Sequence, residues 1–179
     1  MFNKYEKRNN AKQNIVFNFQ YFLYFLSFIM VFIFLFFEIF AKDRYVVSGY
    51  SMTPTFLDGE KLIYQESSII DKESLPNRYD VIIFEDYNGG TDVKRVYGMP
   101  GETIQIKDNQ IFINGEKIED KYNIRSDWSS GIAKKELTLN ENEYFVLGDN
   151  RNHSIDSRFK EIGPVNVGLI IGVVNNNEK

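Results

Sequence analysis

The pattern of hydrophobic and polar positions divides the chain into two parts. Residues 15–40 form an almost continuous apolar run, whose inner stretch over residues 21–37 carries no charge. At ~1.5 Å per residue, a helix over residues 15–40 would span about 39 Å, enough to cross a hydrocarbon core of about 30 Å. After Phe40 the apolar residues occur instead in short runs separated by turn residues. The pattern therefore predicts one apolar helix followed by a domain of short strands.

The short runs predict a mainly β, antiparallel domain over residues 41–179. Asp108-Asn109 and Asn114-Gly115 are each typical of a tight β-hairpin turn. Residues 114–142 are more polar and indicate a small lobe or an extended loop, so we interpret residues 108–142 as a small cap-like insert. Strands are expected over residues 45–47, 61–64, 80–84, 93–97, 103–107, 110–113, 144–147 and 169–174.

Three interpretations compete for the apolar run. A buried core helix is disfavoured, because no soluble fold of this size could cover every face of the segment. A cleavable signal peptide would fit the preceding basic residues, but the run exceeds a usual h-region and lacks a clean small-x-small site at its end. We therefore expect a single-pass transmembrane anchor in a lipid bilayer. The basic residues place segment 1–14 in the cytoplasm and residues 41–179 outside it; they are Lys4, Lys7, Arg8 and Lys12.

Composition and charge exclude several classes of function. Residues 41–179 carry 17 Lys/Arg against 23 Asp/Glu. Such an acidic domain is not expected to bind nucleic acid, which selects a basic surface. The chain has no cysteine and one histidine, His153, so thiol catalysis is excluded and a histidine-rich metal site has little scope. We expect no cofactor and no metal ion.

The candidate chemistry lies in four short segments. Taken singly, each segment has an ordinary structural explanation. A serine beside Gly and Pro is usually a turn residue, and a lysine in a strand usually lies on a solvated face. A GDNR sequence is usually a turn whose charged side chains form an ion pair with each other. Serine becomes a nucleophile only when a neighbouring base accepts its proton. The base for Ser51 would be His153 or a lysine, and burial among apolar groups favours the neutral amine that a lysine base requires. Val93 and Val96 could supply such a setting for Lys94.

Together the four segments closely resemble the type I signal peptidase family, in particular its Gram-positive branch. The family motif S-M-x-P-T matches residues 51–55, and its R-x-D strand matches residues 78–84. The motif K-R-x-x-G-x-P-G matches residues 94–101, and G-D-N-R-x-x-S-x-D-S-R matches residues 148–158. Any one match would be weak, but four in order with family-like spacing are specific. The resemblance covers the anchor and nearly all of residues 45–170.

The resemblance implies a membrane-bound serine endopeptidase that removes signal peptides from exported preproteins. Ser51 would attack the scissile carbonyl, and Lys94 would act as its general base. Ser154 is similar to the family serine that hydrogen-bonds and orients the lysine. Asp156 and Arg158 are similar to the pair that holds this loop in place.

The substrate implied by the resemblance is an extended peptide that adds as a strand along the cleft. Family members select small residues at the first and third positions before the cut. Shallow apolar pockets would enforce that choice by steric clash. The candidate substrate-binding residues are Met52, Val93 and Gly49.

The sequence departs from the family pattern at two positions. Gly49 stands where some members have a serine whose hydroxyl contributes to the oxyanion hole. Ser48 is one position off and would point to the other face of an extended strand, so we expect the Ser51 backbone N–H to supply most of the stabilisation. Asp92 stands where an aromatic residue is frequent, two positions before the lysine, and predicts a substrate pocket of different shape.

Two other functions compete with a signal peptidase. A LexA-like self-cleaving regulator shares a Ser–Lys dyad and a related β fold, but such proteins are soluble and usually carry a DNA-binding module. A signal-peptidase-like accessory factor in pilus or surface-protein assembly would have lost the nucleophile or the lysine. Both Ser51 and Lys94 are present here, which favours the enzyme.

Overall fold

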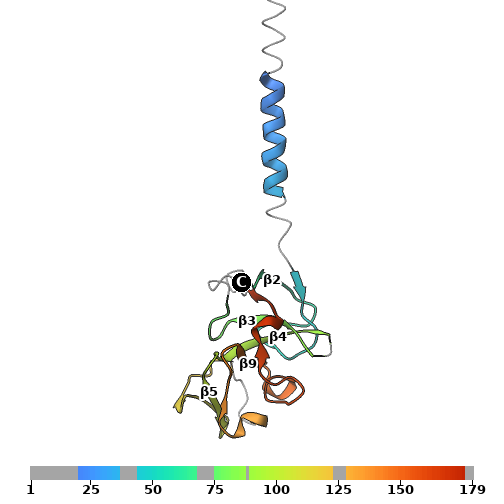
Figure 1. Cartoon of the computed structure of the whole chain (residues 1–179). Coiled ribbons are helices and arrows are strands. Elements are labelled where there is room, and N and C mark those ends of the chain that lie inside the picture. Colours follow the sequence, from blue (N-terminus) through green and yellow to red (C-terminus); the bar gives the residue numbers. More distant parts are fainter. Residues whose placement is uncertain (1–19, 37–43, 68–74, 88, 123–127, 176–179) are drawn as a thin grey trace, which may run out of the picture. The chain divides into compact units, whose positions relative to one another are not determined.

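The computed structural model describes residues 20–36, 44–67, 75–87, 89–122 and 128–175 of the chain. The chain divides into two compact units, Met1–Lys42 and Asp43–Lys179. The first contains a helix over residues 20–36 (Figure 1). Most of its large apolar side chains are exposed. Within the described ranges, no helix is long and apolar enough to cross a membrane. Segment 1–14 and both ends of the expected anchor, residues 15–19 and 37–40, lie outside the described residues, so the anchor remains a prediction.

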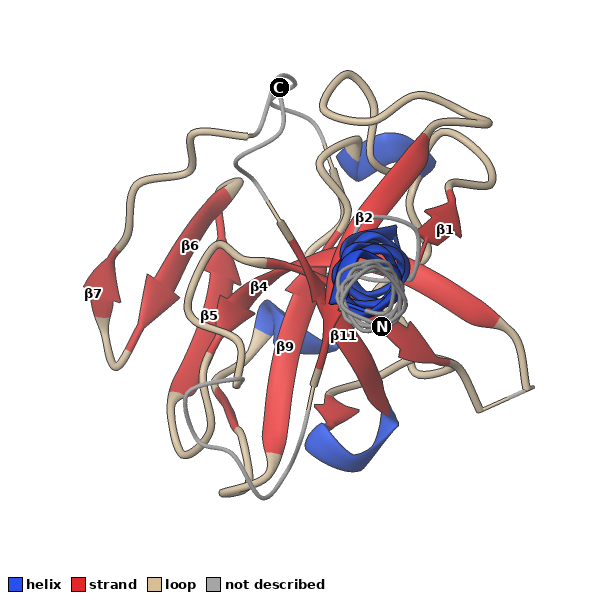
Figure 2. Cartoon of the chain, turned by 90° about the horizontal axis from the view of Figure 1, so that it is seen from above, coloured by secondary structure: helices blue, strands red, loops and turns tan. Residues whose placement is uncertain are grey.

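The second unit contains two antiparallel sheets, which confirms the prediction of a mainly β domain (Figure 2). The larger sheet has seven strands in the order β1-β2-β11-β3-β4-β9-β10. The C-terminal strand β11 lies between β2 and β3 and pairs with both. The strands are β1 (Arg44–Val46), β2 (Lys61–Glu66), β3 (Val81–Glu85), β4 (Thr91–Gly98), β9 (Glu143–Leu147), β10 (Val165–Asn166) and β11 (Ile170–Val174).

The smaller sheet has the order β7-β6-β5-β8. It begins at β5 (Thr103–Lys107), ahead of the expected insert, and continues with β6 (Gln110–Ile113), β7 (Glu116–Lys117) and β8 (Leu137–Thr138). Both predicted hairpin turns are confirmed: Asp108 and Asn109 join β5 to β6, and Asn114 and Gly115 join β6 to β7. All four turn residues have positive φ, as this kind of two-residue hairpin requires.

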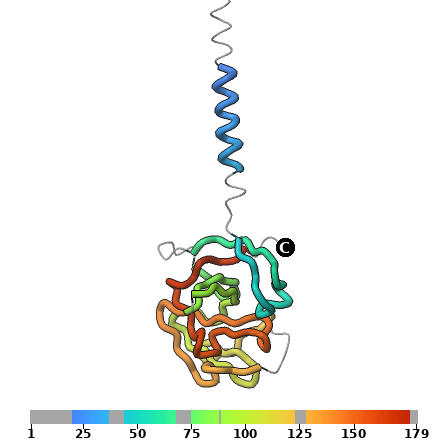
Figure 3. The backbone as a smooth tube through the Cα atoms, turned by 90° about the vertical axis from the view of Figure 1, so that its right-hand side faces the viewer, coloured from blue at the N-terminus to red at the C-terminus, as the bar shows by residue number. Residues whose placement is uncertain are grey.

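The described ranges of the second unit also contain three short 3-10 helices. They are η2 (Gly131–Lys134), η3 (Arg151–His153) and η4 (Val167–Leu169). The expected small lobe over residues 114–142 contributes β7, η2 and β8, so its described part is mostly ordered against the smaller sheet. Figure 3 follows this segment, in yellow and light orange, to one end of the unit.

The core of the second unit is built around β3 and β4. Residues 81–84 form an unbroken apolar run and all four are buried. Alternation along β3 sends Val81 and Ile83 into one apolar cluster, and Ile82 and Phe84 into another. Both faces of β3 are therefore covered, and β3 pairs along its length with β4, which carries Lys94.

We expect Gly131→Ala to destabilise the second unit more than Gly115→Ala. At Gly131, φ is +54° and an added Cβ would lie 2.0 Å from the backbone carbonyl oxygen of Arg158. A backbone clash of this kind should lower the free energy of unfolding by about 3 kcal/mol. Gly115 has φ of +82° but nothing within 4 Å of an added Cβ, so only about 1 kcal/mol of strain is expected there.

The comparison can be measured by urea unfolding of the full chain in detergent. The fluorescence of Trp128, the single tryptophan, reports on the second unit because its side chain is buried there. Equal losses of stability in the two variants would contradict the clash at Gly131.

Candidate active site

Ser51 lies in a tight turn that follows β1. Phe56 N–H donates to Met52 O at 3.0 Å, and Thr53 N–H donates to Tyr50 O at 3.3 Å. Gly49 has φ of +85° and donates its N–H to Asp58 Oδ1 at 2.8 Å. A non-glycine residue would be strained at this φ. The place of the family serine is thus occupied by the residue that this turn requires.

Lys94 extends from β4 toward this turn and is 1% exposed. Its Nζ donates to Ser51 Oγ at 3.2 Å and to Val93 O at 3.1 Å, and it forms an ion pair with Asp92. The fold therefore brings together the serine and the lysine that the sequence singles out. Their catalytic roles remain predictions.

The backbone N–H and C=O of Ser51 differ in their hydrogen bonding within the described part of the chain. Ser51 O accepts from Asn150 N–H at 2.9 Å, whereas Ser51 N–H donates to no acceptor among the described residues. A free N–H beside a nucleophile is the group that an oxyanion hole needs. Ser48 is exposed on the same turn.

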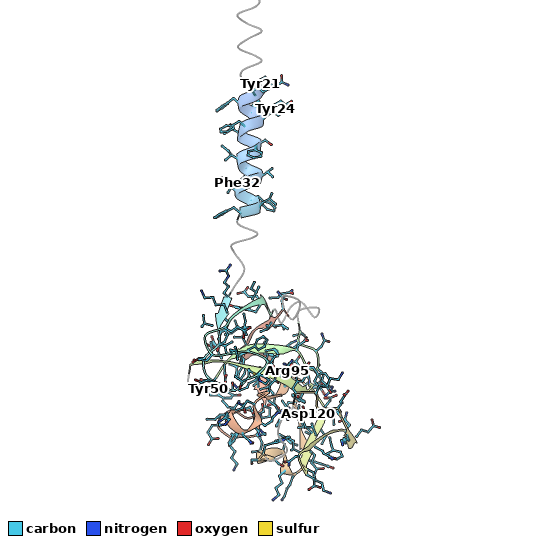
Figure 4. All side chains as sticks on the ribbon, turned by 180° about the vertical axis from the view of Figure 1, so that it is seen from behind. Tyr21, Tyr24, Phe32, Tyr50, Arg95 and Asp120 are labelled. Atoms are coloured by element: carbon cyan, nitrogen blue, oxygen red, sulfur yellow. The ribbon has the colours of Figure 1, made fainter. Side chains whose placement is uncertain are left out.

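A buried ion pair between Arg95 and Asp149 was not assigned a role from the sequence. Arg95 Nε and Nη2 donate to the two carboxylate oxygens of Asp149 at 2.9 and 2.6 Å. Thr55 Oγ1 donates to Asp149 at 2.5 Å, which ties the Ser51 turn to the same carboxylate. Figure 4 labels Arg95 within the interior of the unit and Tyr50 at its surface. Both residues of this ion pair lie in motifs that the sequence singles out: Arg95 in K-R-x-x-G-x-P-G and Asp149 in G-D-N-R.

Asn150 is a second positioning residue that sequence reasoning missed. Its Nδ2 donates to Tyr50 O at 3.1 Å and to Thr53 Oγ1 at 2.8 Å. Together with the backbone bond to Ser51 O, these contacts hold the Ser51 turn from both sides. We call the loop of residues 148–151 the clamp, because these contacts hold the Ser51 turn in place.

Ser154 lies close to this clamp but has a different partner from the one expected. Its Oγ donates to Asp156 Oδ2 at 2.8 Å, and within the described ranges it has no hydrogen bond to Lys94. Asp156 also accepts from Gly148 N–H at 3.0 Å and pairs with Arg158, with both side chains buried. The geometry agrees with a loop-holding role for Asp156 and Arg158, and the expected role of Ser154 toward the lysine stays a prediction.

The two expected pocket residues are covered in this structure. Met52 and Val93 belong to a buried apolar cluster together with Val81 and Ile83, and their exposed fractions are 0% and 1%. Val93 precedes Lys94 on β4, so its side chain points to the opposite face of the strand, and the apolar neighbour of Lys94 across the sheet is Ile82 of β3. Their contact with substrate remains a prediction.

The smaller sheet supports the loop after β9 through a charged cluster. Arg151 donates to both carboxylate oxygens of Asp120 and to the hydroxyl of Tyr97. Burial raises the pKa of the Tyr97 phenol, which stays protonated and donates to Asp120 at 2.7 Å. The Arg151 guanidinium lies 4.8 Å from the ring centre of Trp128. Arg151 thus joins this loop to β4 through Tyr97 and to the segment between β7 and β8 through Asp120 and Trp128.

Comparison with known proteins gives a consistent family. The family described as signal peptidase, peptidase S26, matches residues 19–176. Signal peptidase I V of Bacillus subtilis (strain 168) is 32% identical over 145 residues, covering 75% of this chain and 84% of that protein. Signal peptidase I of Bacillus licheniformis is 36% identical over 66% of this chain and 67% of that protein. A crystal structure of a signal peptidase I from Enterococcus faecalis V583 is 33% identical, with a TM-score of 0.49, over 56% of this chain and 97% of that chain.

Asp149→Asn should destabilise the second unit strongly, because it leaves the buried Arg95 guanidinium without a charged partner. Breaking a buried ion pair in this way costs about 3–5 kcal/mol. The matched variant Thr55→Val removes a single hydrogen bond to the same carboxylate and should cost about 1 kcal/mol. Urea unfolding of the full chain measures both. If Asp149→Asn lowers the free energy of unfolding no more than Thr55→Val does, the ion pair does not stabilise this loop.

Proposed function

The chain belongs to the signal peptidase family, peptidase S26, and from this premise we propose that it cleaves N-terminal signal peptides from exported preproteins with a Ser51–Lys94 dyad. The family consists of serine endopeptidases, so the chain is a hydrolase. The observation that carries the dyad is the 3.2 Å contact between Lys94 Nζ and Ser51 Oγ. Arg95, next along β4, cannot serve as the base because a guanidinium keeps its proton.

Acylation starts with Ser51 and a neutral Lys94. Ser51 Oγ forms a bond to the scissile carbonyl carbon, while the hydroxyl proton passes to Lys94 Nζ. The carbonyl electron pair moves to oxygen, and the free N–H of Ser51 stabilises the resulting oxyanion. Because Lys94 is 1% exposed, bulk water has little access to the amine that receives the proton.

Collapse of the oxyanion breaks the peptide bond. The Lys94 ammonium gives its proton to the leaving amine, so the mature protein departs and an ester to Ser51 remains. Lys94, neutral again, removes a proton from a water that attacks the ester carbon. The bond between that carbon and Ser51 Oγ then breaks, Lys94 returns the proton to Ser51 Oγ, and the cleaved signal peptide leaves as a carboxylate. The same lysine serves both half-reactions, as a general acid–base group does in other covalent hydrolases.

The proposed cellular setting follows from the apolar run and the family. Residues 15–40 form a single-pass anchor in the cytoplasmic membrane, residues 1–14 stay inside, and residues 41–179 act outside. The lipid bilayer and the signal peptides of preproteins are the partners. An anchored active site lies near the bilayer, where signal peptides are held. Met52, Val93 and Gly49 contact the substrate strand, and no metal or cofactor takes part.

Lys94→Arg should be as inactive as Lys94→Ala, because the reaction needs a group that can lose a proton and not a positive charge. Ser51→Ala should match them, with cleavage reduced by a factor of about 10⁴ or more. His153→Asn is the control, since His153 is exposed on η3, and it should retain most activity. The measurement is cleavage of a synthetic preprotein by full-length protein in detergent.

Three results would contradict the dyad. Near-normal cleavage by Lys94→Arg would remove Lys94 as the base. A thousandfold loss in folded His153→Asn would revive a histidine mechanism. Wild-type protein no more active than Ser51→Ala on several preproteins would favour an accessory factor.

A protease added outside intact spheroplasts should digest residues 41–179 and leave the N-terminus protected. The four basic residues before the apolar run predict this orientation. Immunoblotting with separate N-terminal and C-terminal tags measures the outcome, and lysed spheroplasts give the control in which both tags are digested. Protection of the C-terminal tag in sealed spheroplasts would exclude the outward orientation.

A further inference from the structure

Asp92 and Lys94 lie on the same face of β4, because side chains two residues apart along a strand point the same way. In the register of the sheet they stand opposite Phe84 and Ile82 of β3. Both of these neighbours are apolar and buried. The carboxylate and the amine are therefore side by side on an apolar surface that offers neither of them another charge.

The contacts of Lys94 use its full capacity as a donor. An ammonium carries three protons, and Nζ donates to Ser51 Oγ, to Val93 O and to Asp92 Oδ1. Asp92 Oδ1 also accepts from Val93 N–H at 2.8 Å, which fixes the carboxylate in place. The Asp92 side chain is 28% exposed and that of Lys94 only 2%, so water partly screens the pair from one side.

The other ionisable groups near this face are engaged elsewhere. Burial raises the pKa of the Tyr45 phenol, and the charge of Asp92 raises it further, while its hydroxyl donates to Thr91 O. Glu85 is exposed at the end of β3. Arg95 is paired with Asp149, and Arg158 is paired with Asp156. Among the described residues, Asp92 is the carboxylate bonded to Lys94.

We propose that Asp92 is a positioning residue of the dyad, which holds the Lys94 amine beside Ser51 and stabilises its charged form. The sequence predicts only a change of pocket shape at this position, whereas the fold directs the carboxylate at the lysine. In this chain Asp92 makes the lysine contact that the family resemblance assigns to Ser154. The inference rests on the proposed function, because it concerns catalysis only if Lys94 is the base for Ser51.

In this proposal the Asp92 carboxylate stabilises the ammonium that forms during proton transfer, but it does not itself accept the proton. As Ser51 Oγ bonds to the carbonyl carbon, its proton passes to Lys94 Nζ, and Asp92 keeps its negative charge beside the new ammonium. An aspartate plays this part toward the imidazolium of a Ser–His–Asp triad. The same charge also attracts the ammonium before the reaction, through the ion pair between Asp92 and Lys94.

Asp92 thus stabilises the ammonium both before the reaction and as the proton arrives, and these two effects on the rate oppose one another at neutral pH. Removing the charge should move the rising limb of the pH profile to lower pH by about one unit, allowing for partial screening by water. A lysine with lower proton affinity is also a weaker base, so the plateau rate should fall by about threefold. A single assay near pH 7 would miss both changes.

The test is kcat/KM for a synthetic preprotein between about pH 6 and 10.5, with the full-length protein in detergent. Asp92→Asn keeps the size and an oxygen acceptor but removes the charge. Asp92→Glu restores the charge and should return the rising limb toward that of wild type. Glu85→Gln removes an exposed carboxylate from the neighbouring strand and should leave the profile unchanged. An unmoved limb in Asp92→Asn, or a move to higher pH, would overturn the proposal.

A second readout does not require activity. In protein labelled with ¹³C-lysine, the Lys94 Cε signal is assigned by its loss in Lys94→Arg and is followed against pH. Its midpoint should fall by about one unit in Asp92→Asn, and an unchanged midpoint would overturn the proposal. If wild-type cleavage is absent while the midpoint still moves, the proposed function fails and the contact between Asp92 and Lys94 stands.

Discussion

The bidentate ion pair between Arg95 and Asp149 is the contact on which the rest of the site depends. It joins β4, which carries the lysine, to the loop after β9, and Thr55 joins the nucleophile turn to the same carboxylate. Arg95 also donates to Tyr79 O at 2.9 Å and stacks 3.5 Å from the ring centre of Tyr122. One guanidinium thus fixes three separate chain segments. Because both charges are buried, each is costly without the other, and the segments hold together as a unit.

Lys94 occupies an environment with two opposed demands. Its side chain is almost fully buried beside apolar residues, whereas its amine is bonded to the carboxylate of Asp92. A partly exposed carboxylate is a compromise between these demands, since water weakens its attraction without removing it. A lysine that was hydrogen-bonded only to hydroxyl and carbonyl groups would have no negative charge beside its amine. In this chain the charged partner of Lys94 is a residue of β4 itself.

The smaller sheet contributes to the site through support rather than through chemistry. Arg151, in the loop that clamps the Ser51 turn, is paired with Asp120 and lies against Trp128. Asp120 and Trp128 both belong to the segment interpreted as a cap-like insert. Without that segment, a buried guanidinium next to the clamp would lose its partner. The polar character of residues 114–142 therefore reflects contacts with the site loop as well as exposure to water.

The sequence by itself determined the elements that depend on neighbouring residues. Period-two and continuous apolar runs located the long strands, and Asp108-Asn109 and Asn114-Gly115 located two hairpins, because backbone preference and alternation are local properties. Motif spacing identified Ser51 and Lys94. Only the tertiary structure decided that β11 pairs between β2 and β3, that Ser154 bonds Asp156, and that Asp92 bonds Lys94. Those outcomes depend on which segments lie against one another and on side-chain direction within a packed site, which no local pattern encodes.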